Sequence, residues 1–222
     1  MAAHPGIFVL AGTNGAGKSS VGGAVFKRHR ATYFNPDEVT QFILQTNPEL
    51  SQAEANALAW GRGFQLLKDS IEQGFAYAFE TTLGGHSITQ TLLLAASRGI
   101  NISMWYCALA TPELHIARVA ERVRRGGHDI PEQKIRERYD DSRRNLITLL
   151  PHLYVLRVYD NSEEAKHSER PSPSLVLEMR ERRIVHVDLS RTPQWAKPIV
   201  AAAHMIDPRS APTSRPKIRR VR

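Results

Sequence analysis

The segment VLAGTNGAGKSS, residues 9–20, decides the fold because it places a phosphate-binding loop between a strand and a helix. Gly12 to Ser19 match the pattern G-x-x-x-x-G-K-[ST] at every fixed position. The apolar run before the loop, residues 6–11, predicts a short buried strand, and a helix is expected from about Lys18 to His29. The alternative is a glycine-rich turn that binds no nucleotide, and the flanking strand and helix argue against it.

The residue types of this loop define its expected chemistry. Glycines let successive backbone N–H groups surround a β-phosphate at the positive end of a helix. Lys18 is placed to bridge β- and γ-phosphate oxygens of ATP, and Ser19 is placed to bind Mg²⁺. The residues expected to bind the nucleotide are Gly12, Thr13, Asn14, Gly15, Ala16, Gly17, Lys18, Ser19 and Ser20.

The composition predicts one globular α/β domain with a modest appendage, because the chain has 222 residues of which 41% are hydrophobic. A single cysteine, Cys107, excludes an intramolecular disulfide and a cysteine metal cluster. The start of the chain lacks the features of a signal peptide, and no run approaches the roughly 18 apolar residues of a membrane span. We therefore expect a soluble, cytoplasmic protein that does not associate with membranes.

The net charge of +8 is concentrated at the C-terminus. Residues 208–222 carry six positive charges and no negative ones, so residues 1–207 carry only +2. A Pro/Ser/Arg tail of this kind predicts a disordered, solvated segment, and nucleic-acid binding is the less favoured alternative.

Strand and helix patterns alternate along most of the chain. After the first strand and helix, strands are expected at 32–35, 75–83, 101–109 and 152–162, and helices at 51–74, 86–98, 111–123 and 131–149. Ser51 and Glu54 have capping-box spacing, and Thr111 is expected to cap the helix that begins at Pro112. Two β-rich segments, 174–181 and 182–190, are expected to pair as a hairpin.

These patterns predict an α/β fold of the P-loop NTPase, kinase-like class. Its parallel sheet would be sandwiched by helices and followed by a C-terminal β-hairpin and a basic tail. The expected units are a P-loop kinase domain at 1–162 with a helical lid at about 112–150, a hairpin and helix packed on it at 163–207, and the disordered tail at 208–222.

Several sequence features of other P-loop proteins are missing. The strand at 101–109 does not end in an acidic residue, so we find no clear Walker B motif. The guanine-reading pattern Asn-Lys-x-Asp and the transporter signature Leu-Ser-Gly-Gly-Gln are also absent. These absences favour a small-molecule kinase over a motor, a switch or a transporter ATPase.

A kinase needs a base for the acceptor hydroxyl and cations that follow charge onto the moving phosphoryl group. Asp37, in the segment NPDE just after the second strand, is the candidate base, and a helix N-cap is its alternative role. Arg118, Arg122 and Arg125 fall on one helical face, and Arg138 lies on the returning helix. We expect Arg122 and Arg138 to act in catalysis and Arg125 to contact the substrate; a solvated, salt-bridged helix pair is the alternative.

The segment FETTLGG places a carboxylate at the end of a buried strand, where it is costly unless it is paired or used. Glu80, Thr81 and Thr82 are therefore expected to recognise the acceptor, with a structural hydrogen bond as the alternative for Glu80. Asp160 and Asn161, at the end of the last parallel strand, are expected to meet the adenine or ribose, or else to form a plain turn.

Five segments together resemble the zeta toxin family of P-loop proteins, in particular its stand-alone bacterial branch. They are AGTNGAGKSS, NPDE, FETTL, RVAERVRRGGHDIPEQKIRERY and VYDNS, and the resemblance covers about residues 7–162. FETTL and the RGGHDIP segment in this order are much more specific than the phosphate loop.

The resemblance implies a kinase of UDP-N-acetylglucosamine, which the better-understood zeta toxins phosphorylate on a sugar hydroxyl. It implies that Lys18 and Ser19 hold ATP and Mg²⁺, that Asp37 is the base, and that Glu80 and Thr81 face the sugar nucleotide. It also makes an antitoxin protein a partner to look for. Alternatives are another small hydroxyl-bearing acceptor, a nucleotide-dependent regulator or nucleic-acid-associated ATPase, and a polynucleotide or nucleoside kinase.

Overall fold

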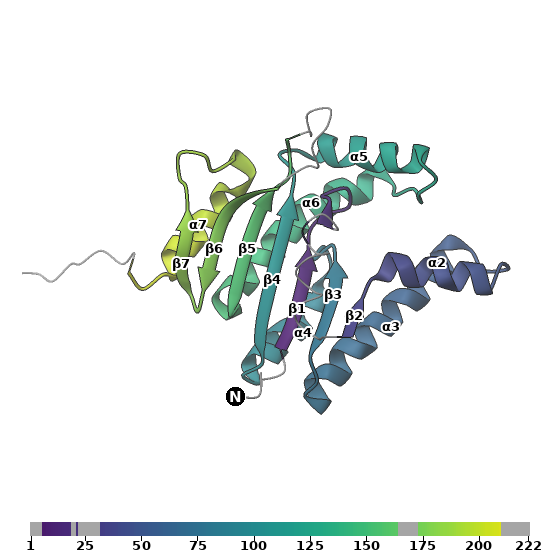
Figure 1. Cartoon of the computed structure of the whole chain (residues 1–222), viewed down its shortest axis with the longest axis horizontal. Helices are drawn as coiled ribbons and strands as arrows, with labels where there is room; N and C mark the ends of the chain where they lie inside the picture. Colours follow the sequence, from purple (N-terminus) through teal and green to yellow (C-terminus); the bar gives the residue numbers. More distant parts are fainter. Residues whose placement is uncertain (1–5, 19–20, 22–31, 164–172, 210–222) are drawn as a thin grey trace, which may run out of the picture.

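The computed structural model describes residues 6–18, 21, 32–163 and 173–209. Within them the strands form one seven-stranded sheet in the order β2-β3-β1-β4-β5-β6-β7 (Figure 1). Five strands are parallel: β1 (Gly6–Ala11), β2 (Thr32–Phe34), β3 (Tyr77–Thr81), β4 (Asn101–Ala108) and β5 (Val155–Asp160). Strand β6 (Ser174–Arg180) pairs antiparallel with β5, and β7 (Arg183–Val187) pairs antiparallel with β6. Strands β6 and β7 form the expected hairpin.

Helices flank this sheet, which confirms the predicted kinase-like α/β fold. They are α2 (Pro36–Thr46), α3 (Gln52–Gln73), α4 (His86–Ser97), α5 (Pro112–Arg124), α6 (Glu132–Leu149) and α7 (Lys197–Ile206), with single 3₁₀ turns at Leu150–His152 and Gln194–Ala196. Of the helix expected at 18–29, Lys18 and Val21 are helical and the other residues lie outside the described ones. The basic tail also lies outside them from residue 210 onward.

Local sequence signals explain where two of these helices begin. The Ser51 side chain accepts from the Glu54 N–H, and the Glu54 carboxylate accepts from the Ser51 N–H, so the predicted capping box closes α3 at its N-terminus. Thr111 caps α5 through the Leu114 N–H, as predicted.

Helix α2 was not predicted from the sequence. Its N-cap residue decides the alternative role that was considered for Asp37. Asn35 is the N-cap: its Oδ1 accepts from the Asp37 N–H at 3.0 Å, and Pro36 occupies the first helical position. Asp37 is therefore a first-turn residue whose side chain remains available, and its alternative role as the cap was wrong.

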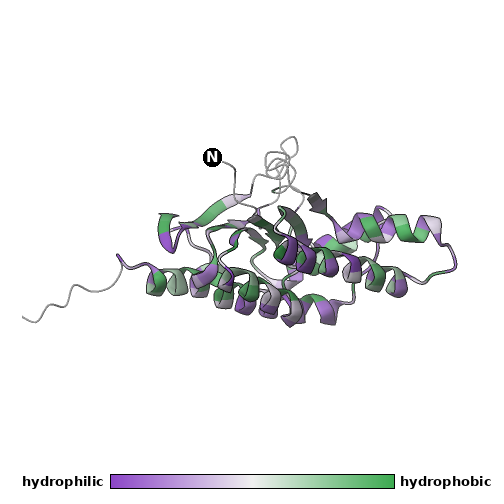
Figure 2. Ribbon diagram, turned by 90° about the horizontal axis from the view of Figure 1, so that it is seen from below, coloured by the Kyte–Doolittle hydropathy of each residue, from purple (hydrophilic) through white to green (hydrophobic). Residues whose placement is uncertain are grey.

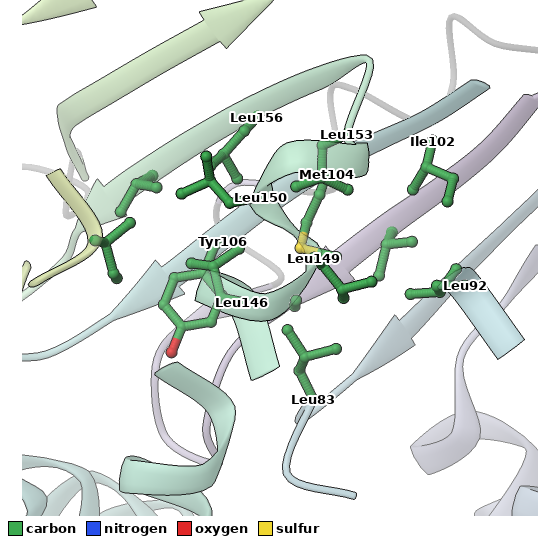
Figure 3. Close-up of a cluster of buried hydrophobic side chains, with 14 of the residues drawn as sticks. Leu83, Leu92, Ile102, Met104, Tyr106, Leu146, Leu149, Leu150, Leu153 and Leu156 are labelled. Carbon is green, nitrogen blue, oxygen red and sulfur yellow. The ribbon is translucent and has the colours of Figure 1, made fainter. Parts of the chain in front are cut away.

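The core occupies both faces of the sheet because neighbouring side chains along a strand point to opposite sides. On one face Ile102, Met104 and Tyr106 of β4 pack against Leu146 and Leu149 of α6, as Figure 3 shows. The Tyr106 hydroxyl is paired with Ser142 at 3.0 Å, so this buried polar group is satisfied. On the other face the intervening residues Trp105 and Cys107 form a second, smaller cluster with Leu10, Ala16, Val21 and Ala78.

The sheet topology decides where a ligand can bind. The carboxyl ends of β1, β3, β4 and β5 meet at one edge of the sheet, and the phosphate loop leaves β1 there. Beyond the short edge strand β2, helices α2 and α3 project from the body of the molecule and carry both polar and apolar residues (Figures 1 and 2). Open α/β sheets bind ligands at this edge. None of the helices in the described ranges is long and apolar enough to cross a membrane.

Candidate active site

The phosphate loop passes so close to β4 that its first position admits only glycine. Gly12 has a φ of +144°, and a Cβ there would lie 2.0 Å from the carbonyl oxygen of Cys107. At Gly17, with a φ of +78°, a Cβ would lie 2.3 Å from Nδ2 of Asn161. The glycine pattern therefore reflects close backbone packing as well as the conformation that a phosphate requires.

Lys18 is held at the centre of this loop. Its Nζ donates to the Gly12 carbonyl oxygen at 3.0 Å. Burial lowers the pKa of the Lys18 ammonium, and the nearby carboxylates of Glu80 and Asp37 partly offset that effect. A phosphate chain beside this ammonium would offset it further, so the loop has the charge and shape that fit the phosphates of ATP. Ser19 and Ser20 lie outside the described residues.

Polar groups from β3, from β4 and from the residue that follows β5 support the loop. The Gly12 N–H donates to the Thr81 carbonyl at 3.1 Å. The Ala16 carbonyl accepts from Asn161 Nδ2 at 3.0 Å and from the Cys107 thiol at 3.1 Å. Burial raises the pKa of that thiol to about 12, so Cys107 is a neutral donor and not a reactive thiolate.

This arrangement gives Asn161 and Asp160 structural contacts. Asn161 also accepts from Arg118 Nη2 at 2.7 Å through its carbonyl, which ties α5 to the base of the loop. Asp160 Oδ1 accepts from Ser162 and, at 3.3 Å, from Trp195 Nε1. Both side chains have hydrogen-bond partners within the protein. Their expected contact with adenine or ribose stays a prediction.

His115 on α5 is a residue that the sequence patterns missed. It is fully buried, its Nε2 accepts from the Leu109 N–H at 3.2 Å, and its Nδ1 donates to the Asn14 carbonyl at 2.7 Å. Burial lowers the pKa of His115 to about 4, so the neutral imidazole holds the phosphate loop against α5. A single histidine on a helical pattern has no spacing that would reveal this role.

Arg138 of α6 reaches the loop from the other side. Its Nη1 donates to Asn14 Oδ1 at 2.8 Å, and its carbonyl accepts from the Thr13 hydroxyl at 3.3 Å. Gly84 makes room for it, because a Cβ at that position would lie 2.8 Å from Arg138 Cγ. Burial lowers the pKa of Arg138, a guanidinium that stays protonated at neutral pH.

Asp37 and Arg122 face each other across the entrance to the site. Their closest side-chain atoms, Arg122 Nη1 and Asp37 Oδ2, are 3.9 Å apart. Arg122 Nη2 also donates to the His128 carbonyl at 3.0 Å, which fixes the turn between α5 and α6. Arg125, by contrast, is largely exposed and bound to Glu121, so its expected contact with the substrate stays a prediction.

The end of β3 brings Glu80 beside the phosphate loop. Glu80 is paired in register with Leu10 of β1, and its carboxylate accepts from the Tyr33 hydroxyl of β2. Glu80 therefore places a carboxylate near Lys18 from β3. The neighbouring strand β4, where a Walker B acidic residue was sought, has none at its end. Thr81 Oγ1 accepts from the Leu83 N–H at 3.0 Å, and Thr82 Oγ1 accepts from the Gly84 N–H at 3.4 Å.

Two cavities open at this edge of the sheet. One, of about 540 Å³, lies between α2 and the α5–α6 turn and is lined by Asp37, Arg118, Arg122, Arg125 and His128, among others. The second, of about 630 Å³, extends from Asn14 and Arg138 past Asp37 and Glu80 to α3, and Thr81 and Thr82 line it as well. Asp37 and His128 line both cavities.

The oxygen groups near Lys18 fit the chemistry of Mg²⁺, which takes one or two protein oxygens and keeps several waters. Glu80 supplies a carboxylate close to Lys18, and Ser19 lies outside the described residues. Among the described residues there is no group of three or more His, Cys, Asp or Glu that would form a complete protein cage for a metal ion.

Residues 7–146 match the model of a protein family described as an AAA domain. The chain belongs to this family. An uncharacterized protein of Haemophilus influenzae is 32% identical over 129 residues, which make up 58% of this chain and 88% of that protein. The family and the loop geometry together establish a P-loop protein with a kinase-like fold.

Two solved structures have a fold similar to that of this chain. A chain of the AvrRxo1-ORF1:AvrRxo1-ORF2 complex with ATP aligns with a TM-score of 0.61 and 15% identity, over 91% of this chain and 64% of that chain. The PezAT toxin-antitoxin system of Streptococcus pneumoniae aligns with a TM-score of 0.58 and 17% identity, over 91% of this chain and 85% of that chain. The fold that the zeta toxin resemblance implied is thereby confirmed.

Proposed function

We propose that the protein is an ATP-dependent phosphotransferase that moves the γ-phosphoryl group of ATP to a hydroxyl of a small acceptor. The observation that carries this proposal is the position of Asp37, which lines both cavities and lies across from Arg122. A carboxylate that interacts with the phosphate-loop lysine and lines a cavity large enough for an acceptor is where a kinase needs its base.

In the proposed reaction the Asp37 carboxylate accepts the proton of the acceptor hydroxyl. The hydroxyl oxygen forms a bond to the γ-phosphorus while the bond from that phosphorus to the β–γ bridging oxygen breaks, and ADP leaves. Lys18 and Arg138 stabilise negative charge on the phosphoryl oxygens as it develops, and Arg122 contributes from α5. Mg²⁺, when bound, would neutralise charge on the β- and γ-phosphates.

The resemblance to the zeta toxins makes UDP-N-acetylglucosamine the first acceptor to test. The structures with similar folds are described as toxin–antitoxin or two-protein complexes, which supports a search for an antitoxin partner of this chain. The cavity of about 630 Å³ is the proposed acceptor cavity. Glu80, Thr81 and Thr82 line it and are proposed to bind the acceptor's hydroxyl groups.

The deciding experiment is incubation of the purified protein with ATP, Mg²⁺ and a panel of nucleotide sugars, monosaccharides, cyclitols and nucleosides. Mass spectrometry then follows the gain of one phosphoryl group on an acceptor. Lys18→Met is the matched control, because it removes the ammonium and keeps a side chain of similar length. Transfer by the parent and none by the variant supports the proposal. Equal transfer by both proteins would overturn it.

A further inference from the structure

The acceptor cavity has an aromatic wall that the proposed reaction does not use. Trp60 and Phe64 lie one turn apart on α3 and are stacked, with ring centroids 5.0 Å apart and an angle of 14° between the ring planes. Both rings line the 630 Å³ cavity, as do Phe34 and Phe79. Trp60 is 51% exposed, whereas Trp105 and Trp195 are only 4% and 3% exposed.

A half-exposed indole inside a cavity is a binding surface for a flat or ring-shaped group. Tryptophan offers a large apolar face at a low cost in conformational entropy, and ligand cavities combine such faces with a few polar groups. Asp37, where the acceptor hydroxyl would react, lines the same cavity. The cavity can therefore hold a ring on Trp60 while one of its substituents reaches Asp37.

The charges in the cavity indicate what kind of ring this is. Four carboxylates line it, against two cations; the carboxylates are those of Asp37, Glu80, Glu137 and Asp141, and the cations are Lys134 and Arg138. Lys134 donates to Glu137 at 3.1 Å, and Arg138 is bound to Asn14. With this balance the wall lacks the excess positive charge that would favour a diphosphate, whereas carboxylates are good acceptors for hydroxyl groups.

We infer that Trp60 and Phe64 form the ring-binding subsite for the acceptor, and that the acceptor is an uncharged, polyhydroxylated ring compound, a sugar or cyclitol, rather than a nucleotide or nucleotide sugar. This inference rests on the proposed function for the direction in which the reactive hydroxyl points. It narrows the acceptors that the proposed function leaves open, and it argues against UDP-N-acetylglucosamine, the acceptor that the zeta toxin resemblance suggests.

Fluorescence quenching tests the subsite without relying on activity. Because Trp105 and Trp195 are buried, acrylamide quenching of the native protein reports mainly on Trp60. The full chain is titrated with N-acetylglucosamine, methyl glucoside and myo-inositol in one set, and with UDP-N-acetylglucosamine and uridine in the other, each with a non-hydrolysable ATP analogue and Mg²⁺. We expect at least one neutral sugar or cyclitol to lower the quenching constant by about twofold or more, since a ring stacked on the indole excludes the quencher.

A matched pair of variants tests the same subsite by kinetics. Trp60→Ala should raise KM for the phosphorylated acceptor about tenfold while kcat stays within about threefold, because the ring contact is the same in the ground and transition states. Leu58→Ala is the control: Leu58 is 55% exposed on the same helix and is not part of the cavity wall. It should leave KM unchanged.

The outcomes separate the subsite from the proposed function. Shielding of Trp60 by a neutral ring compound without any phosphoryl transfer would support the subsite and count against the kinase. Transfer with unshielded Trp60 and a normal KM in Trp60→Ala would overturn the subsite and leave the kinase standing. Shielding only by UDP-N-acetylglucosamine or uridine would overturn the inference, and so would no shielding by any compound. A quenching constant that falls with protein concentration in the absence of any added compound would also overturn it, because a second copy of the chain would then cover Trp60.

Discussion

Arg138 donates a hydrogen bond from Nη1 to Oδ1 of Asn14 at 2.8 Å, so a helix far along the chain contacts the phosphate loop directly. The same residue's carbonyl accepts from Thr13, and Gly84 leaves the space that the arginine side chain occupies. Two contacts from one arginine make the position of α6 depend on the conformation of the loop. The guanidinium of Arg138 therefore lies beside the phosphate loop.

Arg138→Ala should lower kcat by roughly 10²-fold or more while the dissociation constant for ATP changes little, because the charge it would meet is largest in the transition state. Arg144→Ala is the matched control on the same helix, where the arginine is 72% exposed and bound to Asp141. Steady-state kinetics and nucleotide binding on both variants check this. A normal kcat in Arg138→Ala would show that the arginine only supports the loop structurally.

Two glycines on α3 should respond to alanine in opposite directions. At Gly61 a Cβ would meet nothing within 4 Å, and alanine in a helix interior is worth about 1 kcal/mol more than glycine. At Gly63 a Cβ would lie 2.5 Å from the Phe34 ring, so the buried ring must move at a cost of about 1–3 kcal/mol. Chemical denaturation measures both. Destabilisation by Gly61→Ala, or none by Gly63→Ala, would contradict this packing of α3.

Much of the fold was predictable because its signals are local. The phosphate loop, the Ser51–Glu54 capping box and the Thr111 cap each depend on residues within a few positions of one another, and all three elements lie where they were expected. Helix α2 was missed because the residue before Pro36 indicated the end of a strand, and that same residue, Asn35, also caps a helix.

The candidate site was less predictable because its contacts join distant segments. Strand order decides that Glu80 lies beside the loop, and no pattern within β3 reveals that β1 is its neighbour. The contacts of His115 with Asn14 and of Arg138 with Asn14 span more than 100 residues. Residue types identified Lys18, Asp37 and Arg138 as candidates, but only the tertiary fold brings them to one edge.

Stability should fall as the pH drops from about 6.5 to 4, and His115 should cause part of this loss. Its pKa is lowered from 6.5 to about 4 in the folded protein, so in this range the unfolded chain binds the extra proton and the folded one does not. The stabilisation is complete above pH 6.5, and the loss amounts to about 3 kcal/mol by pH 4.

His115→Gln should therefore make the free energy of unfolding depend less steeply on pH between 4 and 6.5. His86→Gln, at an exposed histidine that begins α4, serves as the control and should keep the parental slope. Urea denaturation at several pH values gives these slopes. An unchanged slope in His115→Gln would mean that the buried imidazole takes up its proton as readily as in the unfolded chain.

Phosphoryl transfer by Asp37→Asn, measured beside Glu38→Gln, tests whether Asp37 accepts the proton of the acceptor hydroxyl. Both variants remove one carboxylate charge from the first turn of α2, and Asn35 still caps the helix in each, so both should lose less than about 1 kcal/mol of stability. ATP affinity should also survive in both, because Lys18 and the loop are unchanged. We expect Asp37→Asn to lose about 10²- to 10⁴-fold in single-turnover transfer while Glu38→Gln keeps the parental rate. Parental transfer by Asp37→Asn, with ATP bound normally, would contradict this role of Asp37.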